Sequence, residues 1–166
     1  MINQKVIDNF LPDEDYSNIR KMMLDDYKNF PWYYNPDVSY KGDGNFYFVH
    51  TFFEAKYKLE SSFLSPLMPI LDRLGIKDLW RVKGNLHPRQ GEFIENKPHV
   101  DYDEPHQAAL YYINTNDGHT RLHDGTKIDS VANRLLLFDG SKPHNSTNCT
   151  NEQVRMNINF NYVNKR

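Results

Sequence analysis

The sequence predicts a mainly β domain, a sandwich or a barrel, with helices in its N-terminal part. From residue 79 onward apolar residues recur with a period of two, in short segments separated by turn residues. Eight such segments are typical of an all-β sandwich or barrel. The chain of 166 residues fits one domain over 1–166. We expect 1–78 to be helical support and 79–163 to be the β core.

The N-terminal part begins with residues 5–11, which predict a short strand running into a turn. Pro12 and the acidic residues after it favour a helix start, and apolar residues on one helical face extend this prediction over 13–27. Residues 46–53 predict a strand. Residues 54–74 predict one or two helices, interrupted by prolines.

The predicted strands of the β core are 79–86, 97–102, 107–114, 119–123, 127–130, 134–138, 142–147 and 153–163. In the last strand apolar Val154, Met156, Ile158, Phe160 and Tyr162 alternate with polar Arg155, Asn157, Asn159 and Asn161. A surface strand has the same alternation, but so long an apolar row needs a cover, which the helices can supply. The polar row would then face the inside of a barrel. Buried polar groups without partners are costly, so a polar interior indicates a ligand cavity.

Composition narrows the function. With a net charge of -2 and an isoelectric point of about 6.4, the protein has no overall positive charge that would attract nucleic acid. Cys149 is the one cysteine, which excludes an intramolecular disulfide and a sulfur-rich metal site. No apolar signal segment opens the chain and no run approaches membrane-spanning length. We therefore expect a cytoplasmic protein with no membrane partner.

The segment Pro98-His99-Val100-Asp101 is the candidate metal motif. On a strand, His99 and Asp101 point to the same face and can bind one metal ion. A second histidine from elsewhere would complete the two-histidine, one-carboxylate facial triad of Fe(II) oxygenases. A His-x-acid pair alone arises about once by chance in this composition. Whether His99 and Asp101 form a metal site therefore depends on the other residues of the chain.

His144 is the best candidate for the third ligand, because it lies in the predicted strand 142–147 after a turn. Arg155 faces the polar interior, where a guanidinium needs an anion, and a carboxylate is its best partner. Tyr112 is placed to donate a hydrogen bond to the same anion. We expect Asn157 and Asn159 to line the cavity or to be structural.

Taken together, these residues resemble the 2-oxoglutarate- and Fe(II)-dependent oxygenases, and within them the prolyl 4-hydroxylase-like group. The resemblance spans about 79–163. The segments that carry it are Pro98-His99-Val100-Asp101, similar to Pro-His-x-Asp; Leu110-Tyr111-Tyr112-Ile113-Asn114, similar to a Tyr-Leu-Asn strand; Asp117-Gly118-His119-Thr120, similar to a Gly-Gly-x-Thr turn with its first glycine replaced; and Arg134-Leu135-Leu136-Leu137-Phe138, similar to the strand before the distal histidine. His144 and Arg155 match the distal ligand and the cosubstrate-binding arginine.

The resemblance implies a double-stranded β-helix, a jelly-roll of the cupin kind, with helices packed on the major sheet. His99, Asp101 and His144 would bind Fe(II), and 2-oxoglutarate would chelate the iron with its far carboxylate on Arg155 and Tyr112. The implied reaction hydroxylates a C–H bond and releases succinate and carbon dioxide, with ascorbate as an accessory reductant. Family members that halogenate lack the carboxylate ligand, so Asp101 favours hydroxylation.

The implied substrate is a prolyl residue of a peptide or protein, with a free amino acid or small metabolite as the alternative. We expect His87, Arg89 and Trp32 to contact it, with the loop 87–96 at the entrance. The alternatives are core packing for the aromatic patch 30–34, which is the commoner role of such a patch, and simple exposure for His87. One rival is a nucleic-acid demethylase of the same superfamily, but the second arginine of that group's last-strand motif is absent from 155–161. A rival of another class is a cupin-like binding protein without turnover. The oligomeric state stays open.

Overall fold

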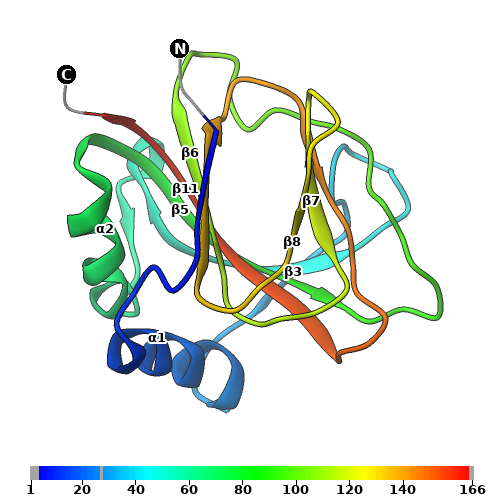
Figure 1. The fold of residues 1–166 in the computed structure, drawn as a ribbon, viewed down its shortest axis with the longest axis horizontal. Helices are drawn as coiled ribbons and strands as arrows, with labels where there is room; N and C mark the ends of the chain where they lie inside the picture. Colours follow the sequence, from blue (N-terminus) through cyan, green and yellow to red (C-terminus); the bar gives the residue numbers. More distant parts are fainter. Residues whose placement is uncertain (1–3, 27, 165–166) are drawn as a thin grey trace.

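The computed structural model describes residues 4–26 and 28–164 and contains two β-sheets that face each other (Figure 1). The larger sheet contains β1 (Lys5–Ile7), β2 (Tyr33–Asn35), β3 (Tyr47–Glu54), β4 (Leu59–Glu60), β5 (Ile76–Pro88), β6 (Gln107–Tyr112), β9 (Arg134–Asp139) and β11 (Val154–Asn164). The smaller sheet contains β7 (His119–Leu122), β8 (Lys127–Asp129) and β10 (His144–Ser146). The strand orders are β1-β9-β6-β11-β5-β3-β2, with β4 on β3, and β10-β7-β8. This antiparallel arrangement confirms the predicted jelly-roll, or double-stranded β-helix.

Two helices cover the outer face of the larger sheet, as predicted. They are α1 (Asp13–Arg20) and α2 (Met68–Leu74), and Figure 1 shows both on the side away from β7 and β8. Their buried residues Ile19 and Ile70 belong to one apolar core with the sheet residues Ile158 and Phe160. Among the described residues, no helix is long and apolar enough to cross a membrane.

β11 has the predicted two-faced character. Its apolar row packs in the core beneath the helices: Met156, Ile158, Phe160 and Tyr162. Its polar row is buried on the opposite face: Arg155, Asn157, Asn159 and Asn161. Since neighbouring side chains on a strand point to opposite faces, the helices cover one row and the space between the sheets receives the other. The interior of the barrel is therefore polar.

The helical segments differ from the prediction in their extent. The helix expected over 13–27 is α-helical to Arg20 and continues as a π-helical turn, Lys21–Asp25, while residue 27 lies outside the described residues. The region 54–74, predicted as one or two helices, holds one α-helix. It contains the 3-10 turns Ala55–Tyr57 and Ser65–Leu67, strand β4 and helix α2. Its prolines begin helical turns instead of breaking them, because a helix tolerates proline in its first turn.

Residues before 79 also supply strands to the larger sheet. β1 pairs with β9 with Val6 opposite Leu136, and β3 pairs with β5 with His50 opposite Gly84. These strands cover backbone edges that β9 and β5 would otherwise expose. The first 78 residues and the β core therefore share one sheet, and the N-terminal part is more than helical support.

The loop that leads to the metal motif is fixed to the segment after β10. β5 runs to Pro88, so the loop expected over 87–96 begins two residues later. The side chain of Asn148 accepts a hydrogen bond from Ile94 N (2.9 Å) and donates one to Glu92 O (2.8 Å). The carboxylate of Glu95 accepts from two guanidinium nitrogens of Arg121 on β7. The loop is thus anchored along its length.

Asn133 joins the N-terminal segment to the larger sheet. Its side chain accepts hydrogen bonds from Leu11 N (2.9 Å) and the Tyr111 hydroxyl (2.8 Å), and donates one to Leu11 O (2.8 Å). Its backbone has a φ of 59°, a left-handed conformation that asparagine tolerates better than most residues. One buried side chain therefore satisfies three polar groups.

We expect Asn133→Ala to lower the free energy of unfolding by about 2–4 kcal/mol, because buried groups of Leu11 and Tyr111 lose their partners. Urea unfolding of the purified protein measures this. Asn9→Ala is the matched control, because Asn9 also has a positive φ (50°) but is exposed. Its free energy of unfolding should fall by about 1 kcal/mol, the cost of placing alanine in a left-handed backbone conformation. Equal losses in the two variants would contradict the role given to the side chain.

The Glu95 carboxylate should make stability depend on acid pH. Its hydrogen bond from Arg121, followed by that from Asn145, lowers its pKa from 4.5 to about 2. A group with a lowered folded-state pKa stabilises the protein fully above its unfolded pKa, and this contribution is lost as pH falls toward the folded value. The urea midpoint of Glu95→Gln should therefore lie below that of the parent at pH 6, and the difference should shrink at pH 3.

Glu92→Gln removes an exposed carboxylate from the same loop and serves as the control. It should leave the midpoint close to that of the parent at both pH values. A gap for Glu95→Gln that is as large at pH 3 as at pH 6 would show that the ion pair with Arg121 is not what the carboxylate contributes.

Candidate metal centre

Residues 97–102 approach the smaller sheet at a single position. His99 N donates to His144 O (3.0 Å), and His144 N donates to His99 O (2.9 Å). The prediction of a regular strand over 97–102 is therefore wrong, since the structure forms one isolated bridge there. Pro98 has no N–H and cannot extend the ladder. The bridge nevertheless fixes the two histidines side by side.

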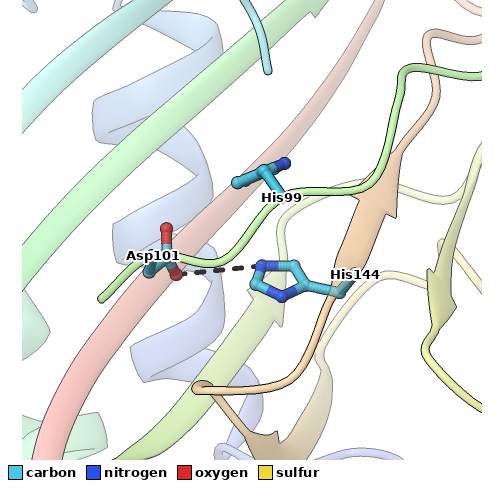
Figure 2. A group of neighbouring side chains, drawn as sticks. All are labelled: His99, Asp101 and His144. Carbon is cyan, nitrogen blue, oxygen red and sulfur yellow. Dashed lines mark ion pairs between the residues drawn. The ribbon is translucent and has the colours of Figure 1, made fainter. Parts of the chain in front are cut away.

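His99, Asp101 and His144 converge on one point, as Figure 2 shows. One potential ligand atom from each residue lies within 4.8 Å of the other two. Nε2 of His144 lies 3.8 Å from Oδ2 of Asp101, and the two imidazole ring centroids are 4.9 Å apart. His99 and Asp101 come from the segment before β6, and His144 comes from β10. The two predicted parts of the motif therefore meet in space.

Both histidines are presented in the form that binds metals. Nδ1 of His144 lies 3.1 Å from Lys142 O; with the proton on Nδ1 this is a hydrogen bond, and Nε2 keeps its lone pair toward Asp101. Burial, and next the charge of His144, lower the pKa of His99 to about 4. His99 is therefore neutral at neutral pH, as a ligand must be.

Asp101 is held by three side chains from the larger sheet. Oδ1 accepts a hydrogen bond from Nη2 of Arg81 (2.7 Å), and Oδ2 accepts from the amides of Asn159 (2.7 Å) and Asn161 (3.0 Å). Burial alone would raise the pKa of Asp101, but the charge of Arg81 leads the opposing effects and the pKa lies well below its ordinary value. The carboxylate is thus charged and fixed in orientation.

A cavity between the two sheets opens beside the three residues. The lining side chains of larger-sheet strands are Tyr47, Lys83, Asn85, His87, Leu110, Asn157 and Asn159. The remaining lining residues are Val38, His99, Asp101, Thr120, His144, Asn145 and Ser146. Asn157 accepts a hydrogen bond from Asn85 (2.9 Å), while Asn159 donates to Asp101. The two asparagines therefore lie in the cavity wall and also brace their neighbours.

Arg155 is fully buried beside Thr120 of the cavity wall and has no carboxylate partner among residues 4–26 and 28–164. Nε donates to Ser130 Oγ (2.8 Å), Nη2 donates to Thr120 Oγ1 (3.0 Å), and Nη1 has no hydrogen-bond partner. Gly118 makes room for it, because a Cβ there would lie 2.5 Å from Cδ of Arg155. A buried cation of this kind calls for an anion.

Tyr112 does not donate toward the cavity. Its hydroxyl donates to Thr120 Oγ1 (2.8 Å), the oxygen that also accepts from Arg155. Neither Tyr112 nor Arg155 lines the cavity itself, whereas Thr120 does. Thr120 therefore brings a polar group to the cavity wall, and Tyr112 and Arg155 are both hydrogen-bonded to it.

The residues present fit a metal ion and an anion together. Two imidazoles and one carboxylate, gathered at one side, form the donor set that Fe(II) takes in facial triads, with adjacent positions left for other ligands. The unpartnered Nη1 of Arg155 offers a charged donor to a carboxylate. The cavity lies between sheets that supply both groups.

Trp32 does not lie at the cavity, so its predicted contact with substrate is wrong. It packs against the apolar core on the helical side, with Phe30 at a ring-centroid distance of 5.0 Å and Nε1 at 3.4 Å from Met23 O. It lies over Gly84, which faces the helices. Aromatic residues near a loop are in this case core packing.

Arg89 and His87 have different surroundings from each other. Arg89 is exposed and does not line the cavity; its backbone N–H donates to Gln153 O (2.8 Å). His87 lines the cavity wall, where its ring stacks on Tyr47 with centroids 5.2 Å apart. Burial, then the charge of Arg155, place the pKa of His87 well below its ordinary value. His87 is a neutral, buried wall residue.

Several residues of the site were absent from the sequence prediction, although His87 was expected to contact substrate. Arg81, Lys83, Asn85 and His87 form a polar row along β5 that lies beside the polar row of β11, with Lys83 opposite Asn159. The period of two in 79–87 could have revealed this row. Thr120 and Ser130, which hold Arg155, gave no such signal, because their contacts depend on how the smaller sheet lies across the larger one.

Comparison with known proteins was made at the levels of sequence and structure. No protein-family model and no curated protein matches the chain. A prolyl-4-hydroxylase from Pseudomonas putida has a similar structure, with a TM-score of 0.67, 14% sequence identity, and coverage of 99% of this chain and 94% of that chain. A prolyl hydroxylase from Trichoplax adhaerens, solved with a hypoxia-inducible-factor peptide, is also similar in structure. Its TM-score is 0.65 at 17% sequence identity, and the match covers 97% of this chain and 83% of that chain.

The similarity extends to enzymes with other substrates. The epimerase SnoN from nogalamycin biosynthesis, solved with Fe3+, α-ketoglutarate and nogalamycin RO, gives a TM-score of 0.67 at 8% identity, covering 98% of this chain and 79% of that chain. All three similarities cover nearly the whole of this chain. They establish that the protein has the fold found in prolyl hydroxylases and other 2-oxoglutarate- and Fe(II)-dependent oxygenases.

Proposed function

We propose that the protein is an Fe(II)- and 2-oxoglutarate-dependent dioxygenase that hydroxylates a C–H bond, in the first place of a prolyl group. The observation that carries this proposal is the pairing of two features in one barrel interior. His99, Asp101 and His144 gather as a facial triad, and Arg155 is a buried cation with an unpartnered nitrogen. A cupin-like protein without turnover has no need for both.

Each side chain has a defined task in this proposal. His99 and His144 supply imidazole nitrogens and Asp101 supplies one carboxylate oxygen to the iron. Arg155, with Thr120, binds the far carboxylate of 2-oxoglutarate. When bound, iron and cosubstrate would supply the oxidant, with 2-oxoglutarate and O2 converted to succinate, carbon dioxide and one oxygen atom for the substrate.

The residues around the triad keep the site in one arrangement. Arg81 and the two asparagines hold Asp101 in one orientation. The presence of a carboxylate ligand supports hydroxylation. A prolyl substrate is supported by the similarity to prolyl hydroxylases, whereas the similarity to SnoN supports a small-molecule substrate.

Turnover tests this function directly. The purified protein, supplied with Fe(II), 2-oxoglutarate and air, should form succinate, and a substrate should gain the mass of one oxygen. Proline-containing peptides and free amino acids are the two arms of the screen. Absence of succinate in every arm, with 2-oxoglutarate bound, would favour the non-catalytic binding protein.

We expect His99→Ala and His144→Ala each to lose bound iron, because two ligands hold a divalent ion far less tightly than three. Metal analysis after anaerobic loading measures this, with circular dichroism to show that the sheets remain. His123→Ala replaces an exposed histidine and should keep its iron. Full iron content in both ligand variants would rule out these residues as the metal site.

We expect Arg155→Ala to weaken 2-oxoglutarate binding by about 30- to 3,000-fold, because a buried charge-assisted contact is worth about 2–5 kcal/mol. Arg155→Lys keeps the charge without the planar fork and should fall in between. Tyr112→Phe removes the hydrogen bond to Thr120 and should weaken 2-oxoglutarate binding by about tenfold or less. The measurement is a titration of each Fe(II)-loaded variant, followed by the metal-to-ketoacid absorption band.

The matched control for Arg155 is Arg134→Ala, since Arg134 pairs with Asp8 away from the cavity. It should bind 2-oxoglutarate as the parent does. If Arg155→Ala keeps the parent's affinity while still folded, the cosubstrate does not use this guanidinium.

A further inference from the structure

Lys83 places a cation in the wall of the cavity itself. It lies on β5, opposite Asn159 of β11, and its side chain is part of the cavity wall. Its ammonium group donates to the hydroxyl of Tyr47 (3.3 Å) and lies 5.7 Å from the centroid of that ring. Its charge also acts on Asp101, one of the contributions that lower the pKa of that carboxyl. Lys83 therefore belongs to the metal end of the cavity.

This ammonium group has no anionic partner within the described part of the chain. The nearest carboxylate of the cavity, Asp101, forms its ion pair with Arg81 (2.7 Å), and no ion pair within 4.0 Å joins Lys83 to any carboxylate there. A phenol hydroxyl is a neutral acceptor and does not balance the charge. A half-buried lysine without a counter-ion is costly, so the site is suited to a ligand with negative charge.

The far carboxylate of the cosubstrate does not account for this charge. Arg155 lies opposite His87 on β5, four residues along the strand from Lys83. Four residues span about 13 Å. The backbone of Lys83 is therefore well separated from that of Arg155, and the carboxylate that Arg155 binds does not balance the charge of Lys83.

We propose that Lys83, together with Tyr47, binds a carboxylate group of the primary substrate. The substrate is then a small carboxylic acid, either a free amino acid or the C-terminal residue of a peptide, and not an internal prolyl residue, whose carbonyl is an uncharged amide. This inference rests on the proposed function and narrows its substrate class. A carboxylate fixed at Lys83 would position a nearby C–H bond of the same molecule at the metal end.

The test compares acids with their primary amides, which differ in this one charge. The probes are L-proline, L-pipecolic acid, L-lysine and a tripeptide that ends in proline, each with its amide, and a peptide with internal proline. Substrate-dependent succinate formation and the mass gain of one oxygen are measured for the Fe(II)- and 2-oxoglutarate-loaded parent, Lys83→Met, Tyr47→Phe and Lys77→Met. Lys77 is exposed on the same strand and is the matched control.

In the parent, at least one acid should exceed its amide in kcat/KM by about 10- to 100-fold, the value of a charge-assisted hydrogen bond. Lys83→Met should remove this preference, Tyr47→Phe should reduce it, and Lys77→Met should leave it unchanged. The affinity for 2-oxoglutarate should be the same in all four proteins. The free acids and the tripeptide distinguish the two sources of the carboxylate.

Three results would overturn the inference: no acid preferred over its amide, internal proline preferred, or a preference that survives Lys83→Met. Weaker 2-oxoglutarate binding in Lys83→Met would also overturn it, because Lys83 would then serve the cosubstrate. The proposed function fails separately, if the parent itself does not bind 2-oxoglutarate. If the parent binds 2-oxoglutarate, the results above contradict only the role given to Lys83 and leave the proposed function intact.

Discussion

The constraint on which the site depends is that every second residue of β11 from Arg155 to Asn161 is polar and buried. Asn159 and Asn161 donate to the carboxylate of Asp101, and Asn157 accepts from Asn85 on the neighbouring strand. Arg155 continues the same row at the far end. Because buried polar groups need partners, this row can exist only with a polar interior facing it. The apolar row on the other face keeps the strand in register against the helices.

The row also explains why the smaller sheet is necessary. It supplies His144 to the metal site and Thr120 to the guanidinium of Arg155, which Ser130, directly after β8, also holds. The anchored loop before His99 brings the remaining ligands into contact with β10 through one bridge. Neither sheet alone forms the centre, so the chemistry depends on the two sheets being held face to face.

The sequence predicted the parts of the fold and site that local patterns determine. The two-residue period placed β11 and its two faces, and Pro98-His99-Val100-Asp101 with His144 identified the triad. Patterns could not give contacts that depend on packing between sheets. Thr120 was therefore missed as the partner of Arg155, and Tyr112 was expected to point at the ligand instead of at Thr120. Trp32 was misplaced because aromatic composition does not tell which face of a sheet a side chain covers.

The charged side chains of the interior are only partly paired with one another, and this determines which ligands the interior favours. Asp101 is already balanced by Arg81, so its carboxylate adds little net negative charge to the cavity. Lys83 and Arg155 are then left without carboxylate partners within the described residues, at separate positions along the larger sheet. A divalent ion at the triad would add further positive charge between them. An interior with this distribution favours two anionic ligands that meet at the metal, one extending toward Arg155 and the other toward Lys83.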